Sequence, residues 1–225
     1  IPMRDHPIQN VSEPFQYRAI GIVRGNYRPI ENNKLTRGLI ITVDGQEIEA
    51  VILGRMLPLI KKHIDLNDKH LWVVYPRCRE HSLLHLQIGG IWEPSKLDLS
   101  NVNQVNSKNT NINNVSENLL DQIKEGDDYF SIRGELIYTN PQSKNIVIKI
   151  RQKSKSVNRK SASFKINING EIPLEYIRNF VSLNVRRSKQ ILDLEDFENI
   201  GPIPTRSFKS LKSNSSDNKH NSAIK

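Results

Sequence analysis

The sequence lacks the residues from which several classes of site are built. Its 225 residues include one cysteine, Cys78, so an intramolecular disulfide and a zinc site made of several thiolates are excluded. No apolar run approaches the roughly 20 residues of a membrane-spanning helix, and the N-terminal residues do not show the pattern of a signal peptide. No Walker-type phosphate loop and no dinucleotide-binding glycine motif is present. We therefore expect a cytoplasmic protein with no membrane span, no cofactor and no enzymatic activity.

The remaining reactive side chains do not form a recognisable active site. His81 and His85 are four residues apart, but they fall at a turn-to-strand boundary, where that spacing does not bring them together as metal ligands. Asp127 and Asp128 precede an expected strand, which indicates a cap or a solvated turn. Cys78 lies between two arginines that favour the thiolate, yet no histidine–acid partner stands near it, so we expect a passive thiol.

The positive charge is unevenly distributed along the chain. The formal net charge is +9, with 33 basic and 24 acidic residues. Residues 1–94 carry 12 basic and 10 acidic side chains, residues 95–143 carry 4 and 7, and residues 144–225 carry 17 and 7. The surplus therefore belongs to the last third of the chain, and it favours a polyanionic partner such as nucleic acid or an acidic membrane surface.

Composition divides the chain into five parts. An N-terminal extension, 1–14, precedes a first folded unit, 15–94. An asparagine-rich stretch, 95–126, has little apolar surface, and we interpret it as a disordered linker that includes a short helix at 117–124. A second, basic unit covers 127–204. The Ser-, Lys- and Asn-rich end, 205–225, has the composition of a disordered basic tail.

The two units show the same order of elements. In the first unit, strands are predicted at 17–24, 36–43, 46–53, 71–75 and 84–92. Asp44-Gly45 forms a hairpin turn, and a helix lies at 57–64 if it begins near Leu57, before Pro58. In the second unit, strands are predicted at 129–138, 144–153, 162–169, 183–186 and 190–197, with a helix at 174–180. This weak internal repeat favours a duplication.

A β-β-β-α-β-β order resembles the oligonucleotide/oligosaccharide-binding (OB) fold. We therefore predict a mainly β (α+β) protein made of two small OB-like β-barrel units. An SH3-like barrel and a split small sheet give similar patterns and remain alternatives. The segments Tyr17–Gly25 and Leu71–Arg77 also resemble a conserved cyanobacterial family, a resemblance that implies no particular activity.

The densest cluster of cations follows the second strand of the second unit. Because strand side chains alternate, Ile146, Ile148 and Ile150 face one way and basic residues face the other, about 7 Å apart. Such a row can follow the phosphates of an extended strand, and further cations lie in the serine-rich loop and in the turn before the last strand. The predicted contacts are Lys149, Arg151, Lys153, Lys155, Arg159, Lys160, Arg186, Arg187 and Lys189.

The first unit offers a second candidate surface on the loops after its first and fourth strands, which flank the ligand groove in the OB plan. The cations of this surface are Arg24, Arg28, Lys34, Arg37, Arg77 and Arg79. Tyr27 and Tyr75 are candidates for stacking on bases, while Trp72 and Trp92 are expected in the core.

These patterns predict a protein that binds RNA or single-stranded DNA without catalysis, the flexible linker allowing both units to engage one strand. The prediction requires the cations between Lys149 and Arg187 to converge on one surface. The alternative is a protein-interaction adaptor that docks on a larger assembly, for example a ribonucleoprotein.

Overall fold

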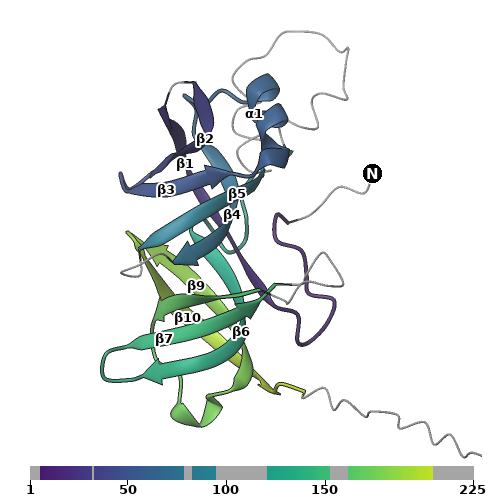
Figure 1. The fold of residues 1–225 in the computed structure, drawn as a ribbon, viewed down its shortest axis with the longest axis vertical. Helices are drawn as coiled ribbons and strands as arrows, with labels where there is room; N and C mark the ends of the chain where they lie inside the picture. The colour runs from purple at the N-terminus through teal and green to yellow at the C-terminus, as the bar shows by residue number, and fades with distance from the viewer. Residues whose placement is uncertain (1–5, 32, 79–82, 95–120, 153–161, 205–225) are drawn as a thin grey trace, which may run out of the picture.

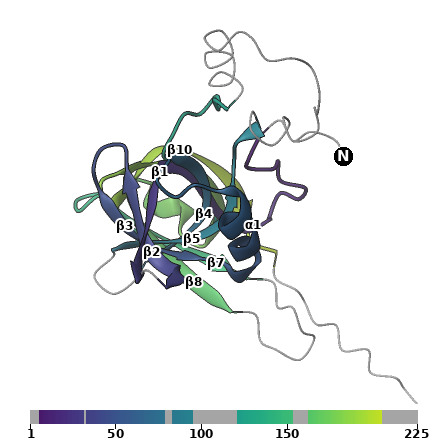
Figure 2. The ribbon, with the colours of Figure 1, turned by 90° about the horizontal axis from the view of Figure 1, so that it is seen from above.

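Two five-stranded β-barrels make up the described part of the chain (Figure 1). The computed structural model describes residues 6–31, 33–78, 83–94, 121–152 and 162–204. The barrels follow one another along the long axis of the molecule, and the view from above looks onto the first barrel (Figure 2). The predicted mainly β class and the two OB-like units are confirmed.

The first barrel contains five strands and one short helix. The elements are β1 (Arg18–Glu31), β2 (Lys34–Thr42), β3 (Glu47–Ile52), the 3-10 turn η1 (Gly54–Met56), α1 (Leu57–His63), β4 (His70–Cys78) and β5 (Leu84–Ile91). Strands β1, β2 and β3 form a meander, β3 pairs in parallel with β5, and β4 joins β5 to β1. The pairing order β1-β2-β3-β5-β4-β1 closes the sheet in the OB arrangement.

The second barrel repeats this pairing with β6 (Tyr129–Asn140), β7 (Asn145–Arg151), β8 (Ser163–Asn169), the 3-10 turn η3 (Leu174–Tyr176), β9 (Asn179–Ser188) and β10 (Ile191–Pro202). Again the third and fifth strands, β8 and β10, pair in parallel. Strand β9 pairs with both β10 and β6, which closes the second barrel. The helix predicted in the second barrel was wrong, and the short helix predicted before it is not seen in those of its residues that the structure describes. Residues 174–180 form only a 3-10 turn before β9, which begins at Asn179, and residues 121–124 are not helical; residues 117–120 lie outside the described part.

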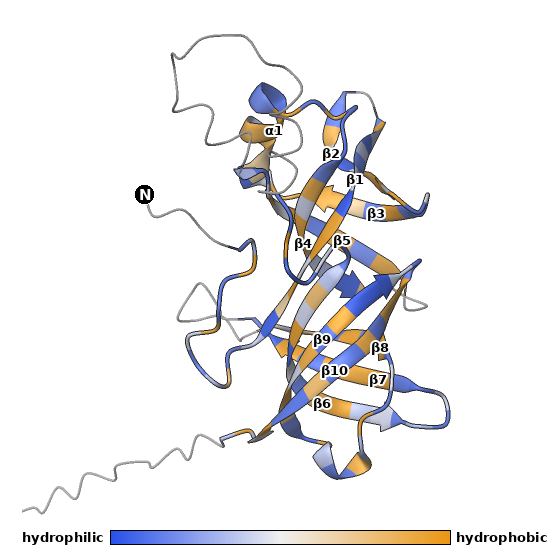
Figure 3. Cartoon of the chain, turned by 180° about the vertical axis from the view of Figure 1, so that it is seen from behind, coloured by the Kyte–Doolittle hydropathy of each residue, from blue (hydrophilic) through white to orange (hydrophobic). Residues whose placement is uncertain are grey.

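Local sequence accounts for most element boundaries. Gly45 has a φ of +78°, which suits the turn between β2 and β3, as the Asp44-Gly45 pair predicts. Helix α1 begins at Leu57 and holds Pro58 in its first turn, where a missing N–H costs nothing. Along β7 the side chains of Ile146, Ile148 and Ile150 are buried while the residues between them are more exposed, which confirms the predicted alternation. Figure 3 shows polar and apolar positions interleaved in both barrels.

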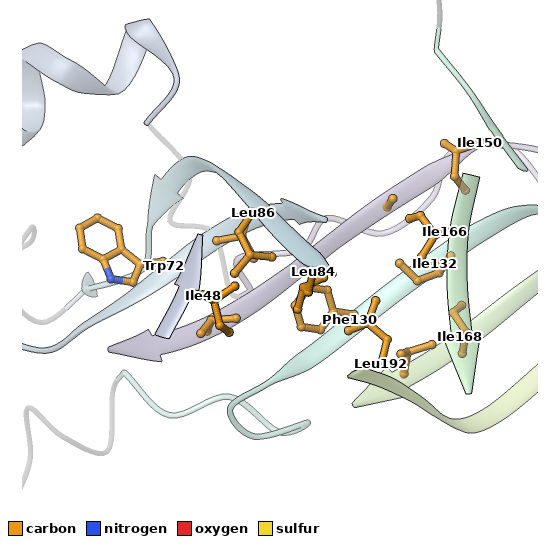
Figure 4. Packing of buried hydrophobic residues seen from close by; sticks show 14 of the residues in the cluster. Ile48, Trp72, Leu84, Leu86, Phe130, Ile132, Ile150, Ile166, Ile168 and Leu192 are labelled. Carbon is orange, nitrogen blue, oxygen red and sulfur yellow. The ribbon is translucent and has the colours of Figure 1, made fainter. Parts of the chain in front are cut away.

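The two barrels share a strand pairing and a core. Strand β1 pairs antiparallel with β6 as well as with β2 and β4, and Gly21 lies opposite Phe130. A Cβ atom on Gly21 would lie 2.2 Å from Cδ1 of Phe130, so glycine is what lets the ring lie on the backbone. Phe130 belongs to one continuous apolar cluster that includes Trp72 of the first barrel and Ile166 of the second (Figure 4). This joint, which we call the seam, fixes the barrels relative to each other.

No helix in the described ranges is long and apolar enough to cross a membrane.

Candidate nucleic-acid interface

A cleft of about 1360 Å³ opens beside the seam. One side is the outer face of β4 and β5, with Tyr75, Arg77 and Gly89, together with Arg55 of η1. The other side is the nearby end of the second barrel, where β7 and β8 contribute several side chains, and residues 7–17 border it beside the start of β1. Figure 1 shows this N-terminal stretch alongside the junction of the barrels. Both barrels therefore contribute to one site.

Strand β4 carries the central side chains of the cleft. Its inward positions Trp72 and Val74 are buried in the barrel, so Tyr75 and Arg77 alternate with them on the outer face. The pairing of β4 with β5 shifts between Val73 and Val74, a bulge that places Gly89 beside the ring of Tyr75. The β4–β5 ladder therefore orients both side chains toward the cleft.

Arginines dominate the charge of this cleft. Arg55 is exposed and its Nη2 donates to the hydroxyl of Tyr75 at 3.3 Å. The guanidinium of Arg77 lies 3.7 Å from the ring centroid of Phe164, and its Nη1 donates to the carbonyl of Pro76. Neither arginine forms an ion pair with a carboxylate of the described residues. Burial lowers the pKa of Arg77, although arginine remains charged at neutral pH. These cations are available to an anionic ligand.

The N-terminal wall is held by two further arginines of the seam. Arg18 and Arg133 lie opposite each other on β1 and β6. Arg18 donates to the hydroxyl of Ser131 and to the carbonyl of Gln9, while Arg133 donates to the carbonyls of residues 14 and 16. Burial lowers the pKa of both guanidinium groups, and Arg133 lowers that of Arg18 further. The backbone of residues 9–16 thus supplies the acceptors that two facing cations require.

Two polar atoms of residues that line the cleft have no hydrogen-bond partner in the described part of the chain. They are the hydroxyl oxygen of Tyr17 and the indole nitrogen of Trp92. Burial raises the pKa of Tyr17, against a smaller opposite effect of Arg151, whose guanidinium lies 5.8 Å from the Tyr17 ring centroid. Burying a polar atom without a partner is costly, so the wall of the cleft is not optimised for stability alone.

Those predicted cations of the second unit that the structure describes do not converge on one surface. In the strand register, Lys149 of β7 lies opposite Glu135 of β6, whereas Arg186 of β9 lies opposite Tyr129 of the same strand. Six residues of strand separate these positions, about 20 Å. Arg151 lies at the cleft, where Nη2 contacts Glu135 at 3.3 Å. Lys189 is exposed in the β9–β10 turn with a φ of +56°. Predicted contacts outside the described residues are Lys153, Lys155, Arg159, Lys160 and, in the first unit, Arg79.

The arginine pair before β10 is used inside the protein. Arg187 is 5% exposed and bonds to Asp128 at 2.7 Å and to Asp44 of the first barrel at 3.1 Å. Arg186 forms an ion pair with Glu195 and donates to the carbonyls of residues 125 and 127. These bonds hold both guanidinium groups inside the protein, which argues against the prediction that Arg186 and Arg187 contact phosphates.

A second ion pair crosses the seam. Arg24 donates from Nε to Asp127 at 2.7 Å. The Asp127-Asp128 pair, predicted as a cap or a solvated turn, therefore joins the barrels. The acids meet cations at this point because the segment before β6 runs beside both barrels, an arrangement that is not visible in local sequence.

The remaining candidates of the first unit lie away from the cleft. Tyr27 is 2% exposed, its hydroxyl donates to the carbonyl of Leu35, and burial raises its pKa well above the ordinary value. Its ring therefore offers no free face to a base. Arg28 pairs with Glu47 at 2.6 Å, Lys34 pairs with Glu31, and Arg37 is exposed on β2.

The thiol and histidine candidates give no reactive site in the described residues. Cys78 is half-buried, and burial raises its pKa, which is the opposite of the effect expected from neighbouring arginines. His81 lies outside the described part, and within that part no group of three or more His, Cys, Asp or Glu side chains is placed to hold a metal ion.

Sequence reasoning missed three of the most informative residues of the cleft. Arg55 follows a glycine between a strand and a helix, Phe164 occupies an inward strand position at the end of a barrel, and Gly89 belongs to a bulge. The pair Gly89-Gly90 within a predicted strand was the one available signal, since glycine inside a strand often marks a bulge or a close approach.

The strand pattern agrees with comparisons to known families. Residues 19–99 match the model of the PatR RNA-binding protein, N-terminal OB-fold domain. Residues 132–201 match the model of the cyanobacterial OB-fold-like RNA-binding domain, C-terminal. No curated protein matches the chain. The two matches fall in order on the two barrels and together cover about two thirds of the sequence.

Proposed function

Because the chain belongs to the cyanobacterial family of tandem OB-fold RNA-binding proteins, we propose that it holds one single strand of RNA in the cleft beside the seam. The observation that carries the proposal is the combination of Arg55 and Arg77, which have no carboxylate partner in the described residues, with the rings of Tyr75 and Phe164. Arginines bind phosphates and aromatic rings stack on bases, and stacking requires bases that are unpaired.

The size of the cleft supports a polymer as the ligand. A volume of about 1360 Å³ exceeds the roughly 300–1,000 Å³ typical of sites for one small molecule. The seam also changes how the two barrels cooperate. Because β1 pairs with β6, the two barrels present one preformed surface. The RNA strand can therefore contact both barrels at once, and its affinity does not depend on a flexible linker between them, as was expected from the sequence.

We further propose that the protein acts by binding, without catalysis, and in the cytoplasm. Glu93, one of the carboxylates that line the cleft, is bonded to the imidazole of His70, but that histidine is only 2% exposed and its other ring nitrogen bonds to the carbonyl of Asp65, so it is held inside the protein rather than presented to a ligand as a general base. Binding then depends on phosphate neutralisation, which makes affinity fall steeply as salt is added.

The test is a salt titration with a fluorescent single-stranded RNA of about ten nucleotides. For a single strand, the slope of log affinity against log salt is about −0.7 for each neutralised phosphate. Arg55→Gln should weaken binding and make the slope shallower by about 0.7, if it contacts one phosphate. Arg37→Gln removes the same charge from an exposed position of β2 outside the cleft and should leave the slope unchanged. Absence of RNA binding, or equal effects of the two substitutions, would contradict the proposal.

A further inference from the structure

We infer that the cleft seats two consecutive unpaired bases, the first on the ring of Tyr75 and the second beside the Arg77–Phe164 stack. The inference rests on the proposed function and specifies its ligand, a dinucleotide step of an extended single strand. It also places the contact on the β4–β5 side of the first barrel, whereas the OB plan places ligands on strands two and three.

The first platform is built by a glycine, an arginine and a tyrosine. A Cβ atom on Gly89 would lie 2.3 Å from Cε2 of Tyr75, so the ring rests against the bare backbone of the bulge. Arg55 fixes the other end of the ring, since its Nη2 donates to the Tyr75 hydroxyl at 3.3 Å and lies 3.5 Å from the carbonyl oxygen of Gly89. Tyr75 is half-buried and lines the cleft. Held in this way, the ring loses little freedom when a base stacks on it.

The second platform is a guanidinium group already stacked on a ring. Arg77 lies 3.7 Å from the centroid of Phe164, which belongs to the second barrel. Both residues line the cleft and both are half-buried. A guanidinium plane supported on one side by an aromatic ring is suited to stack a nucleobase on the other side, and it adds a charge near the phosphates.

The spacing of the platforms selects an extended strand. Tyr75 and Arg77 are two residues apart on the same face of β4, so their side chains leave the backbone about 7 Å apart. Bases stacked on each other in a helix are separated by about 3.4 Å. Consecutive bases therefore reach both platforms only when the strand is unstacked. Arg55, which has no carboxylate partner among the described residues, is placed for the backbone of such a strand, while Arg151 across the cleft is already paired with Glu135 at 3.3 Å.

The experiment compares two ligands of equal length, an oligouridylate and an abasic ribose-phosphate oligomer, which keeps the charges and lacks the bases. Tyr75→Ala should weaken binding of oligouridylate by about 5- to 150-fold, the range of stacking one base, and should leave the abasic oligomer unaffected. Tyr75→Phe keeps the ring but loses the hydroxyl that Arg55 contacts, so it should bind oligouridylate far better than Tyr75→Ala does. Phe164→Leu should give the loss without a change of charge.

A glycine variant supplies an independent arm. Gly89→Ala adds one methyl group that displaces the Tyr75 ring, so it should reproduce the loss on oligouridylate. Gly54→Ala is the matched control, because its Cβ atom would meet nothing within 4 Å. Thermal unfolding of each variant verifies folding. If wild type binds neither oligomer, the proposed function fails. If wild type binds oligouridylate but the Tyr75 and Gly89 variants bind it equally well, or lose the abasic oligomer to the same extent, the two-base inference alone is overturned.

Discussion

Replacing Arg187 by methionine should loosen the seam without adding bulk. The guanidinium bonds to Asp128 at 2.7 Å, to Asp44 at 3.1 Å and to the carbonyl of Lys189 at 2.9 Å. It is therefore the one described side chain that forms ion pairs with an acid preceding β6, Asp128, and with the β2–β3 turn at the same time. Methionine keeps an unbranched apolar stem in the same space and leaves both carboxylates without their cationic partner.

The cost follows from how deeply these carboxylates are buried. Removing one partner of a fully buried ion pair costs about 3–5 kcal/mol. Here 48% of the Asp44 side chain and 27% of the Asp128 side chain are exposed, so water screens the stranded charges. We therefore expect a loss of about 1.5–3 kcal/mol, the value of hydrogen bonds to charged groups. Burial already raises the pKa of Asp128 despite its bond to Arg187, so this acid bears most of the loss.

Urea unfolding measures the effect. With a slope of about 2 kcal/mol per molar urea, Arg187→Met should lower the midpoint by about 1 M. In an Asp128→Asn background the same substitution should cost at least about 0.5 kcal/mol less, because the two residues interact directly. An unchanged midpoint, or fully additive losses, would refute the reasoning.

Three further predictions concern stability. Gly21→Ala should destabilise by about 1–3 kcal/mol, because its methyl group would clash with the ring of Phe130, and urea unfolding detects this; a neutral effect would contradict the close approach. Tyr17→Phe should be neutral or stabilise by up to about 1 kcal/mol, since the buried hydroxyl has no partner among the described residues; a clear loss in thermal unfolding would show a missing bond. The hydroxyl of Thr42, and then Arg187, hold the pKa of Asp44 below its ordinary value, so the stability that this acid contributes is present above about pH 4 and is lost as the pH falls through the lower folded pKa. Melting temperatures between pH 2.5 and 6 should decline in wild type and decline less in Asp44→Asn.

Local sequence was sufficient for the fold of each barrel. Alternating isoleucines on β7, the Asp44-Gly45 turn and a helix beginning at Leu57 are decided by neighbours a few residues away. Strand lengths were less accurate. Strand β9 runs from Asn179 to Ser188, although only 183–186 was predicted, because its first residues pair with β6 and β10 rather than with local partners.

The site could not be derived in the same way, because it depends on how the barrels meet. The pairing of β1 with β6 brings Phe164 beside Arg77 and brings acids beside Arg24 and Arg187. A count of regional charge treats an arginine inside an ion pair and an arginine facing a cleft as equal. The sequence therefore indicated the class of ligand, and the tertiary arrangement decided which of the cations remain available to bind it.

Chemical-shift mapping during titration with a single-stranded RNA tests the central claim most directly. We predict that the largest shifts fall on the backbone amides of residues 73–75, 77 and 89–91 and on that of Arg151, on both sides of the cleft. Shifts confined to the outer faces of β2 and β3, or to β7 and β8 around Lys149, would show that RNA binds elsewhere and would contradict the account.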